Sequence, residues 1–513
     1  MKHKFLSTIS GATLYISFIL ILSKGIGFIR EIVFAGYYGT GVQYDIYLVS
    51  SVIPLTLNII VFFVGQNYFI PSLSKYSNFG EKSEIKFSKQ VFVSYILLTF
   101  ILIIPLYFFS EWFLEIFFSL PQKEISSTPK LIFQILLLTV PLSAGISILT
   151  SYLQSKLEFK SPAISQLFIN FSIIILIVLY SSSLGNISIA LGYLIGTLLQ
   201  FVYLLRKTFG IRAFILETKS LLPEKIRSVL YLNIIYIVLI ESIGQLYSII
   251  DRIFFAELPE GGVASIYYAQ SLFLFPISIF TFALSTVIFP RISKSFSENN
   301  LFEVNEILSR SSRVTVLIFT PISLVYLFYS TPLIKLVFER GKFSNEGTLM
   351  TSEALGLFTI SLVFYAIYSI LNKVFYSANL SKLLLLLTII GICLKYLLNY
   401  QLVAYFAQAG LALSTSITYI VFFIISLYLI KLKLNVSLDK KVWLELLLNV
   451  FNGIFSYIFV EAFFYIFSFT DIILVKLSFY LFVYMINNLL IEYETIKFIK
   501  QNLFRNQLFF NLK

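Results

Sequence analysis

Residues 23–45 read S-K-G-I-G-F-I-R-E-I-V-F-A-G-Y-Y-G-T-G-V-Q-Y-D, and they place charged side chains inside a long apolar run. Lys24, Arg30 and Glu31 lie within that run, and Asp45 begins the next one after a glycine-rich turn. Ionisable groups at membrane depth are costly, so they usually face a partner or a water-filled cavity. The stretch therefore predicts a membrane helix whose charges line a cavity, with the rest of the chain as its wall.

Plainer interpretations of these charges stay open. Lys24 and Glu31 share one helix face, while Arg30 points about a third of a turn away from them. Lys24 and Arg30 could extend to the lipid headgroups, or pair with Glu31. Asp45 could simply cap the N-terminus of its helix, since aspartate is a preferred capping residue.

The composition is that of a polytopic all-α membrane protein. Of 513 residues, 58% are hydrophobic and only 12% are charged, whereas soluble domains are about 25% charged. The chain has one cysteine, Cys393, and one histidine, His3. A disulfide within the chain is therefore impossible, and we expect no Cys/His metal site, no cofactor and no enzymatic activity.

The apolar runs and the positive charges together predict the topology. Runs long enough to span a bilayer indicate fourteen helices, near 10–36, 46–70, 91–110, 131–152, 163–181, 187–205, 228–250, 264–290, 314–330, 349–376, 383–401, 409–430, 442–467 and 472–491. With both termini in the cytoplasm, cytoplasmic segments hold 28 Lys and Arg residues and outer loops hold 6. This asymmetry follows the positive-inside rule. The net charge of +12 thus indicates membrane topology rather than a nucleic-acid partner.

Short sequence blocks recur at a nearly constant distance. Residues 70–75 (I-P-S-L-S-K) match 289–294 (F-P-R-I-S-K), 113–118 match 333–338, and 189–192 match 411–414. Such repeats predict two six-helix lobes of the same orientation, as in transporters whose site lies between halves. We expect an N-lobe over 1–221, a C-lobe over 222–440, and two further helices with a basic cytoplasmic tail over 441–513.

Several blocks together resemble the MurJ (MviN) lipid II flippase family. They are K-G-I-G-F-I-R-E with G-T-G-V-Q-Y-D-I-Y-L-V, residues 249–272 with 283–294, F-E-R-G-K-F at 338–343, and G-L-A-L-S-T-S at 410–416. The family belongs to an exporter superfamily that includes O-antigen-type polysaccharide flippases and multidrug exporters. The resemblance covers the first twelve helices and implies a V-shaped pair of lobes around a cationic cavity.

The resemblance also implies a function. By alternating access, a polyprenyl-diphosphate-linked saccharide would cross the bacterial cytoplasmic membrane from the inner to the outer leaflet. The last two helices would hold its lipid tail. The implied partners are this lipid, the membrane lipids and enzymes of envelope synthesis.

The diphosphate site implied by the resemblance is only partly present. Lys24 stands where the family usually has arginine, Arg30 matches, and Asp45 matches an acidic residue. Asn58 and Ser271 stand where lipid II flippases carry arginine. The departures favour a divergent member, or a flippase for another lipid-linked saccharide.

A second set of residues resembles a sodium site of some relatives. It comprises Asp251, Lys395, Asn399 and Thr415. Because a lysine occupies one amide position, our hypothesis is that its ammonium replaces the cation and pairs with Asp251. Alternatively Arg252 pairs with Asp251, and Lys395 extends elsewhere.

Two further carboxylates lie in predicted spans, at Glu241 and Glu461. No partner for either is visible in the sequence. Glu241 could couple transport to protons, but a neutral, hydrogen-bonded acid is the simpler interpretation of this residue.

Two other functions remain open from the sequence. The chain could export a polysaccharide unit or a small molecule, or it could be a non-transporting scaffold that recruits enzymes through its basic tail, 496–513. A cavity shared by Lys24, Arg30 and Asp45 would favour transport. Contacts of these residues only with headgroups or neighbouring helices would favour a scaffold.

Overall fold

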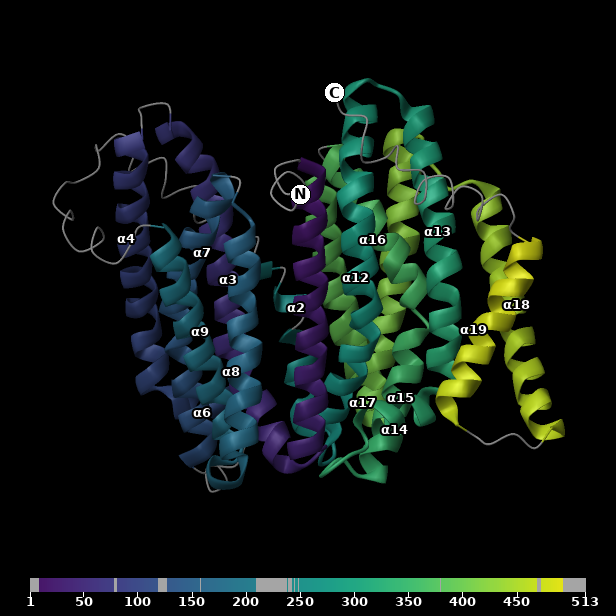
Figure 1. The fold of residues 1–513 in the computed structure, drawn as a ribbon, viewed down its shortest axis with the longest axis horizontal. Coiled ribbons are helices and arrows are strands. Elements are labelled where there is room, and N and C mark those ends of the chain that lie inside the picture. Colours follow the sequence, from purple (N-terminus) through teal and green to yellow (C-terminus); the bar gives the residue numbers. More distant parts are fainter. Residues whose placement is uncertain are drawn as a thin grey trace. The chain divides into compact units, whose positions relative to one another are not determined.

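The computed structural model describes residues 9–77, 81–118, 127–156, 158–208, 249–378, 380–467 and 472–491, together with 238, 242–243 and 245–247. The regular secondary structure of these residues is helical (Figure 1). The chain divides into two compact units: an N-terminal unit, residues 15–264, and a C-terminal unit, residues 1–14 and 265–513. Each unit is described by itself below.

The N-terminal unit is a bundle of long apolar helices. Its described helices are α2 (Ile9–Tyr38, which starts in the other unit), α3 (Val42–Ser77), α4 (Glu81–Phe108), α5 (Ser110–Phe118), α6 (Ser127–Leu137), α7 (Thr139–Ser155), α8 (Lys160–Leu184), α9 (Ile187–Thr208) and the 3-10 turn η1 (Phe255–Glu257). Its core packs α3, α4 and α7 together through buried side chains such as Phe69, Phe92 and Leu149. The predicted apolar runs thus form helices that pack against α3.

Two glycines allow α8 and α9 to pack backbone to backbone. A Cβ on Gly192 would lie 2.6 Å from the Cα of Ile173, and one on Gly196 would lie 2.5 Å from the Cα of Ile169. Small residues four apart are the usual means of close helix packing in membranes. This contact fixes α8, the helix that carries Asn170, within the unit.

Alanine at Gly196 is expected to destabilise the N-terminal unit, because its methyl group would meet backbone atoms that cannot rotate away. Overpacking of this kind costs about 1–3 kcal/mol. The measurement is the midpoint of thermal aggregation of the detergent-solubilised protein. Gly356→Ala is the matched control, since a Cβ there would meet nothing within 4 Å. Equal thermal midpoints for the two variants would contradict the conclusion that Gly196 is needed for the close packing of α8 and α9.

The C-terminal unit holds α12 (Gly262–Ser297, whose first residues lie in the other unit), α13 (Leu301–Phe328), α14 (Ser330–Phe338), α15 (Asn345–Thr359), α16 (Leu362–Ser377), α17 (Ser381–Leu434), α18 (Lys440–Ile466) and α19 (Ile473–Ile491). α17 breaks at Ala407, where φ is 44° and ψ is −125°. The break divides it into two arms, as the predicted spans 383–401 and 409–430 require.

The helix bounds repeat along the chain as the sequence blocks predict. α12, α13 and α14 begin 220 residues after α3, α4 and α5, at 262, 301 and 330 against 42, 81 and 110. α5 and α14 are both nine residues long. The repeated order of helices supports two related halves, although the predicted boundary at 221/222 lies outside the described residues. The V shape of the two lobes stays a prediction.

The helices identify a multi-pass membrane protein. Among the described residues nine are long and apolar enough to cross a membrane, or ten if the bent pair α15 and α16 is one span. α17 is counted as one of these nine helices, although the break at Ala407 divides it into two arms. α2, with three charges in its second half, and the shorter α19 are not in this count. Each predicted span but the seventh, 228–250, coincides with a described helix or helix pair.

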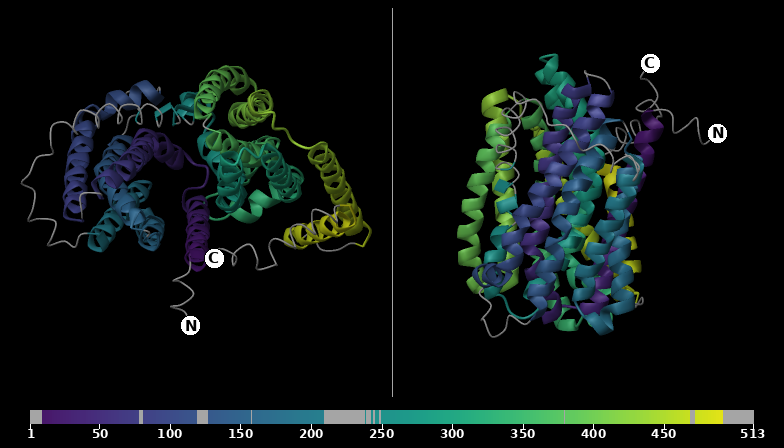
Figure 2. Two further views of the ribbon diagram at one scale, coloured as in Figure 1. Left: turned by 90° about the horizontal axis from the view of Figure 1, so that it is seen from above. Right: turned by 90° about the vertical axis from the view of Figure 1, so that its left-hand side faces the viewer.

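The last two helices pair through polar side chains. Asn452 donates to the side-chain oxygen of Asn488 at 3.0 Å, and Tyr484 donates to Asn449. Figure 2 shows α18 and α19 in yellow at one edge of their unit. Buried amides that satisfy each other hold two membrane helices in one register.

Glu461 has partners that the sequence did not reveal. Its carboxylate pairs with Lys476 of α19 at 3.1 Å and accepts a 2.9 Å hydrogen bond from Tyr329. The sequence showed no partner for Glu461, and the structure supplies one because the α18–α19 hairpin brings a lysine to it. Glu241 lies outside the described residues.

Candidate substrate site

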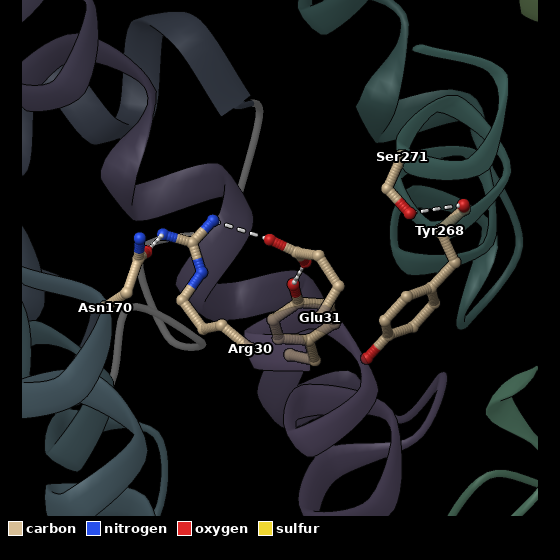
Figure 3. A network of polar contacts seen from close by, with 6 residues as sticks. Arg30, Glu31, Asn170, Tyr268 and Ser271 are labelled. Carbon is tan, nitrogen blue, oxygen red and sulfur yellow. Dashed lines mark hydrogen bonds and ion pairs between the residues drawn. The ribbon is translucent and has the colours of Figure 1, made fainter. Parts of the chain in front are cut away.

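Arg30 is held in place by groups from two helices. Its Nη2 pairs with Glu31 Oε1 at 2.6 Å, and its Nη1 donates to Asn170 Oδ1 of α8 at 3.1 Å (Figure 3). Its guanidinium also lies 5.4 Å from the ring centroid of Phe34, one turn along α2. A planar, always-charged fork held this way is a fixed cation rather than a flexible surface charge.

The Arg30 fork is not closed off by these contacts. Its side chain is 26% exposed and that of Glu31 is 16% exposed. Within the described part of the chain its buried Nε has no hydrogen-bond partner. The second oxygen of Glu31 accepts a long hydrogen bond, 3.5 Å, from Tyr44. The predicted pairing of Arg30 with Glu31 is present, and the Arg30 side chain remains partly exposed.

Lys24 lies less than two turns before Arg30 on α2, and it is exposed. An exposed ammonium on a flexible stem can move towards an anion, but it acts as a point charge. Its predicted role beside Arg30 stays a prediction.

Asp45 holds the start of a helix that is far away in the sequence. Its Oδ2 accepts from the backbone N of Gly261 at 2.8 Å, and its Oδ1 accepts from that of Ala264 at 2.7 Å. All three residues belong to the N-terminal unit. A carboxylate at a helix N-terminus satisfies orphan N–H groups and the helix dipole. The capping interpretation thus fits its contacts, with the correction that Asp45 caps α12 rather than its own helix.

The turn that Asp45 holds admits only glycine at position 261. Gly261 has a φ of +78°, and a Cβ there would lie 2.3 Å from the carbonyl oxygen of Thr40. The turn between α2 and α3 therefore packs directly on the turn that opens α12. Asp45 and Gly261 together define this latch, which we call the Asp45 latch.

Asn58 is buried between helices. Only 5% of it is exposed, and its amide donates to Thr139 at 2.7 Å and accepts from Ser143 at 2.5 Å. It also donates to the carbonyl of Pro54 at 2.9 Å. Asn58 therefore joins α3 to α7 at the position where the resemblance implied an arginine, and its predicted place at the substrate site stays a prediction.

Ser271, in the C-terminal unit, is half-buried, and its hydroxyl donates to the carbonyl oxygen of Tyr268 at 2.8 Å (Figure 3). The hydroxyl gives the Tyr268 carbonyl a second hydrogen-bond donor besides the helix N–H, and it adds no charge. Its predicted contact with substrate stays a prediction.

The second set of residues is divided between the units. Lys395, 2% exposed, and Asn399 lie on the first arm of α17, and Thr415 lies on the second. Asn399 accepts from Ser414 across the break, and Thr415 donates to the carbonyl of Leu411 at 2.9 Å. The two arms thus share a buried polar cluster.

Asp251 is half-buried in the N-terminal unit, so its predicted pairing with Lys395 stays a prediction. Its neighbour Arg252 donates to the carbonyl of Val52 at 3.3 Å.

Asn170 is the site residue that the sequence reasoning missed. It stands in the apolar run F-I-N-F-S-I-I-I of α8. A lone amide in such a run is a signal, since polar side chains in membrane helices usually meet a partner. Its partner, 140 residues away, is visible only in the fold.

Two curated sequences illustrate the similarity to known proteins. A probable lipid II flippase MurJ of Buchnera aphidicola subsp. Acyrthosiphon pisum is 32% identical over 414 residues, which cover 79% of this chain and 80% of the relative. The lipid II flippase MurJ of Thermosipho africanus is 28% identical over 478 residues, which cover 88% of this chain and 96% of the relative.

Solved structures show the same fold. Lipid II flippase MurJ in an inward closed conformation has a TM-score of 0.79 at 23% identity, covering 96% of this chain and all of that one. An inward-facing multidrug resistance MATE family transporter of the MOP superfamily has a TM-score of 0.63 at 14% identity. The family model described as lipid II flippase MurJ matches residues 34–484. The chain therefore belongs to the lipid II flippase MurJ family.

Proposed function

We propose that this chain moves lipid II, or a closely related polyprenyl-diphosphate-linked saccharide, from the cytoplasmic to the outer leaflet of the bacterial cytoplasmic membrane. The observation that carries the proposal is Arg30, a partly exposed side chain whose guanidinium Glu31 and Asn170 hold inside a membrane protein. The relatives named for lipid II flippase activity support it.

The chemistry of the cargo fits this site. A diphosphate needs fixed donors and positive charge where water is scarce, and arginine offers both in a planar fork. The polyprenyl tail is apolar and can stay in the lipid, so only the head group needs a polar path. Lys24, exposed on the same helix, would supply the second charge.

Asn58 and Ser271 are neutral, and the contacts of each are made within the protein. The proposed site therefore depends more heavily on Arg30 than a site with four cations would. A hydrogen bond to a charged group contributes about 1.5–3 kcal/mol, so the loss of one such group has a large effect on binding.

The proposed orientation has both termini in the cytoplasm, which the distribution of Lys and Arg supports. The head group would then leave the cytoplasmic leaflet with its negative charge. One charge moved through 100 mV contributes about 2.3 kcal/mol. An inside-negative potential would thus favour outward movement of the diphosphate.

Reconstituted vesicles test the proposal. Lipid II with a fluorescent head group is placed in both leaflets with the purified protein, and a membrane-impermeant quencher reports the fraction that becomes accessible. We expect full accessibility with the protein and about half in protein-free vesicles. If accessibility stays at the protein-free level for lipid II but rises for a polysaccharide-linked lipid, the cargo is that polysaccharide-linked lipid and not lipid II. No rise for any lipid would favour the scaffold.

We also propose that transport does not require sodium, because Lys395 is a buried, tethered cation on α17, the helix that also carries the buried Asn399 and Thr415. Replacement of sodium by potassium in the same vesicles is expected to leave the rate within about twofold. Lys395→Met keeps the apolar stem and removes the charge, which should lower the rate at least tenfold, since unbalancing a buried charge costs about 3–5 kcal/mol. A rate that follows an imposed sodium gradient would contradict this proposal.

A further inference from the structure

An aromatic cluster lies inside the C-terminal unit, apart from the charged residues above. Its inner members are Phe273 of α12, Phe358 of α15 and Phe422 of the second arm of α17, and all three are buried. Phe273 and Phe358 stack with centroids 5.3 Å apart. These rings form a rigid floor, since packed aromatic side chains have few alternative rotamers.

Three tyrosines form the outer layer of this cluster. Tyr365 and Tyr368 stand one turn apart on α16, and Tyr419 comes from α17. Tyr365 stacks on Tyr419 at 4.1 Å between centroids, and Tyr368 stacks on Phe422 at 5.3 Å. Each of the three tyrosines is half-buried. We call Tyr365, Tyr368 and Tyr419 the tyrosine platform.

The platform differs in chemistry from ordinary core packing. The floor is phenylalanine throughout, whereas every residue of the partly exposed layer carries a phenol. One turn beyond Tyr368, the side-chain oxygen of Asn372 is buried and accepts no hydrogen bond among the described residues. A buried acceptor without a donor costs about 1–3 kcal/mol, so a hydroxyl-rich ligand that donates to it would be favoured.

The platform also lies at the right depth for a head group taken from the cytoplasm. α16 ends at Ser377, beside the cytoplasmic lysines of the predicted topology, Lys373 and Lys382. Tyr365 and Tyr368 are nine to twelve residues before that end, or about 14–18 Å along the helix axis. In the predicted topology, phenols at that depth would lie inside the bilayer, below the interfacial aromatic belts.

We propose that the tyrosine platform is a stacking subsite for the saccharide of the lipid-linked head group, an inference that rests on the proposed function. A sugar ring presents one face of C–H groups, whose partial positive charge complements the negative face of an aromatic ring. Its hydroxyls would bond the phenols and Asn372.

Two soluble probes isolate the contribution of the sugar: a short-chain prenyl diphosphate without sugar, and the same diphosphate carrying a disaccharide. Binding to the full-length protein in nanodiscs is measured for the wild type and for Tyr365→Leu and Tyr368→Leu. Each leucine variant is expected to weaken binding of the glycosylated probe about tenfold. Binding of the sugar-free probe should not change, which also shows that the variants are folded.

Matched controls sharpen the test. Tyr365→Phe keeps the ring, so its affinity for the glycosylated probe should fall by no more than about threefold, the value of one neutral hydrogen bond. Tyr376→Leu changes an exposed tyrosine at the end of the same helix and should alter neither affinity.

Three results would overturn the inference. Wild-type protein that binds both probes equally would remove the subsite while leaving the proposed function standing. Leucine variants that weaken both probes equally, or neither, would show that the platform is packing only. Wild-type protein that binds neither probe would remove the subsite together with the proposed function.

Discussion

Alanine at position 30 is expected to abolish transport while leaving folded protein in the membrane. The change removes the guanidinium that Glu31 and Asn170 hold, and it leaves the Glu31 carboxylate, 16% exposed, without its ion-pair partner. Truncating one member of such a pair costs about 2–5 kcal/mol in binding, which is a loss of more than 30-fold in affinity for a diphosphate. The rate of lipid accessibility in vesicles measures the loss.

Two variants separate the charge of Arg30 from its geometry. Arg30→Lys keeps the charge but not the two-pronged fork, so we expect an intermediate rate. Glu31→Gln keeps a hydrogen-bonding partner for Arg30 and removes the negative charge beside the site, so diphosphate binding should be retained. Full transport by Arg30→Ala would remove Arg30 from the proposed site.

Alanine at position 45 is the second change expected to stop transport. It removes both oxygens that cap the start of α12, and each hydrogen bond to a charged acceptor contributes about 1.5–3 kcal/mol. The latch ties the α2–α3 turn to residues 261–264, so its loss should free the C-terminal end of α2, the helix that carries Lys24 and Arg30. We expect at least a tenfold lower rate and a lower thermal midpoint.

The opposite side of the latch provides an independent check. Gly261→Ala places a methyl group against Thr40 and forces an unfavourable φ, so it should reproduce the Asp45→Ala phenotype. Asp439→Ala is the matched control, because Asp439 caps α18 through a single exposed bond to Lys441 at 3.2 Å. Its loss should cost about 1 kcal/mol and leave transport intact. A normal rate in both latch variants would show that the latch is dispensable.

The helices were predictable because each is a local feature of hydropathy. The sequence repeat has a counterpart in the fold, since the short helices α5 and α14 occur where blocks 113–118 and 333–338 match, although hydropathy did not predict either helix. The charge on Arg30 and its pairing with the adjacent Glu31 were visible for the same reason: the two residues are neighbours on one helix.

Contacts between distant segments were not predictable from one sequence. Asp45 accepts hydrogen bonds from residues 216 and 219 positions further along the chain, and Arg30 donates one to Asn170, 140 positions away. Asn58 was expected at a binding site because of its position in the resemblance, but its amide is satisfied by Thr139 and Ser143. The partner of a polar side chain in a membrane helix depends on which helices pack together, and hydropathy does not carry that information.

The most direct test of the account is a replacement in a living cell. The chain is expressed in a bacterium whose own lipid II flippase can be switched off, its presence in the membrane is confirmed, and surviving cells are counted. Survival is the predicted result, and it would mean that Arg30 and Lys24 suffice where Asn58 and Ser271 are neutral. Cell death with the protein present in the membrane would contradict transport of lipid II.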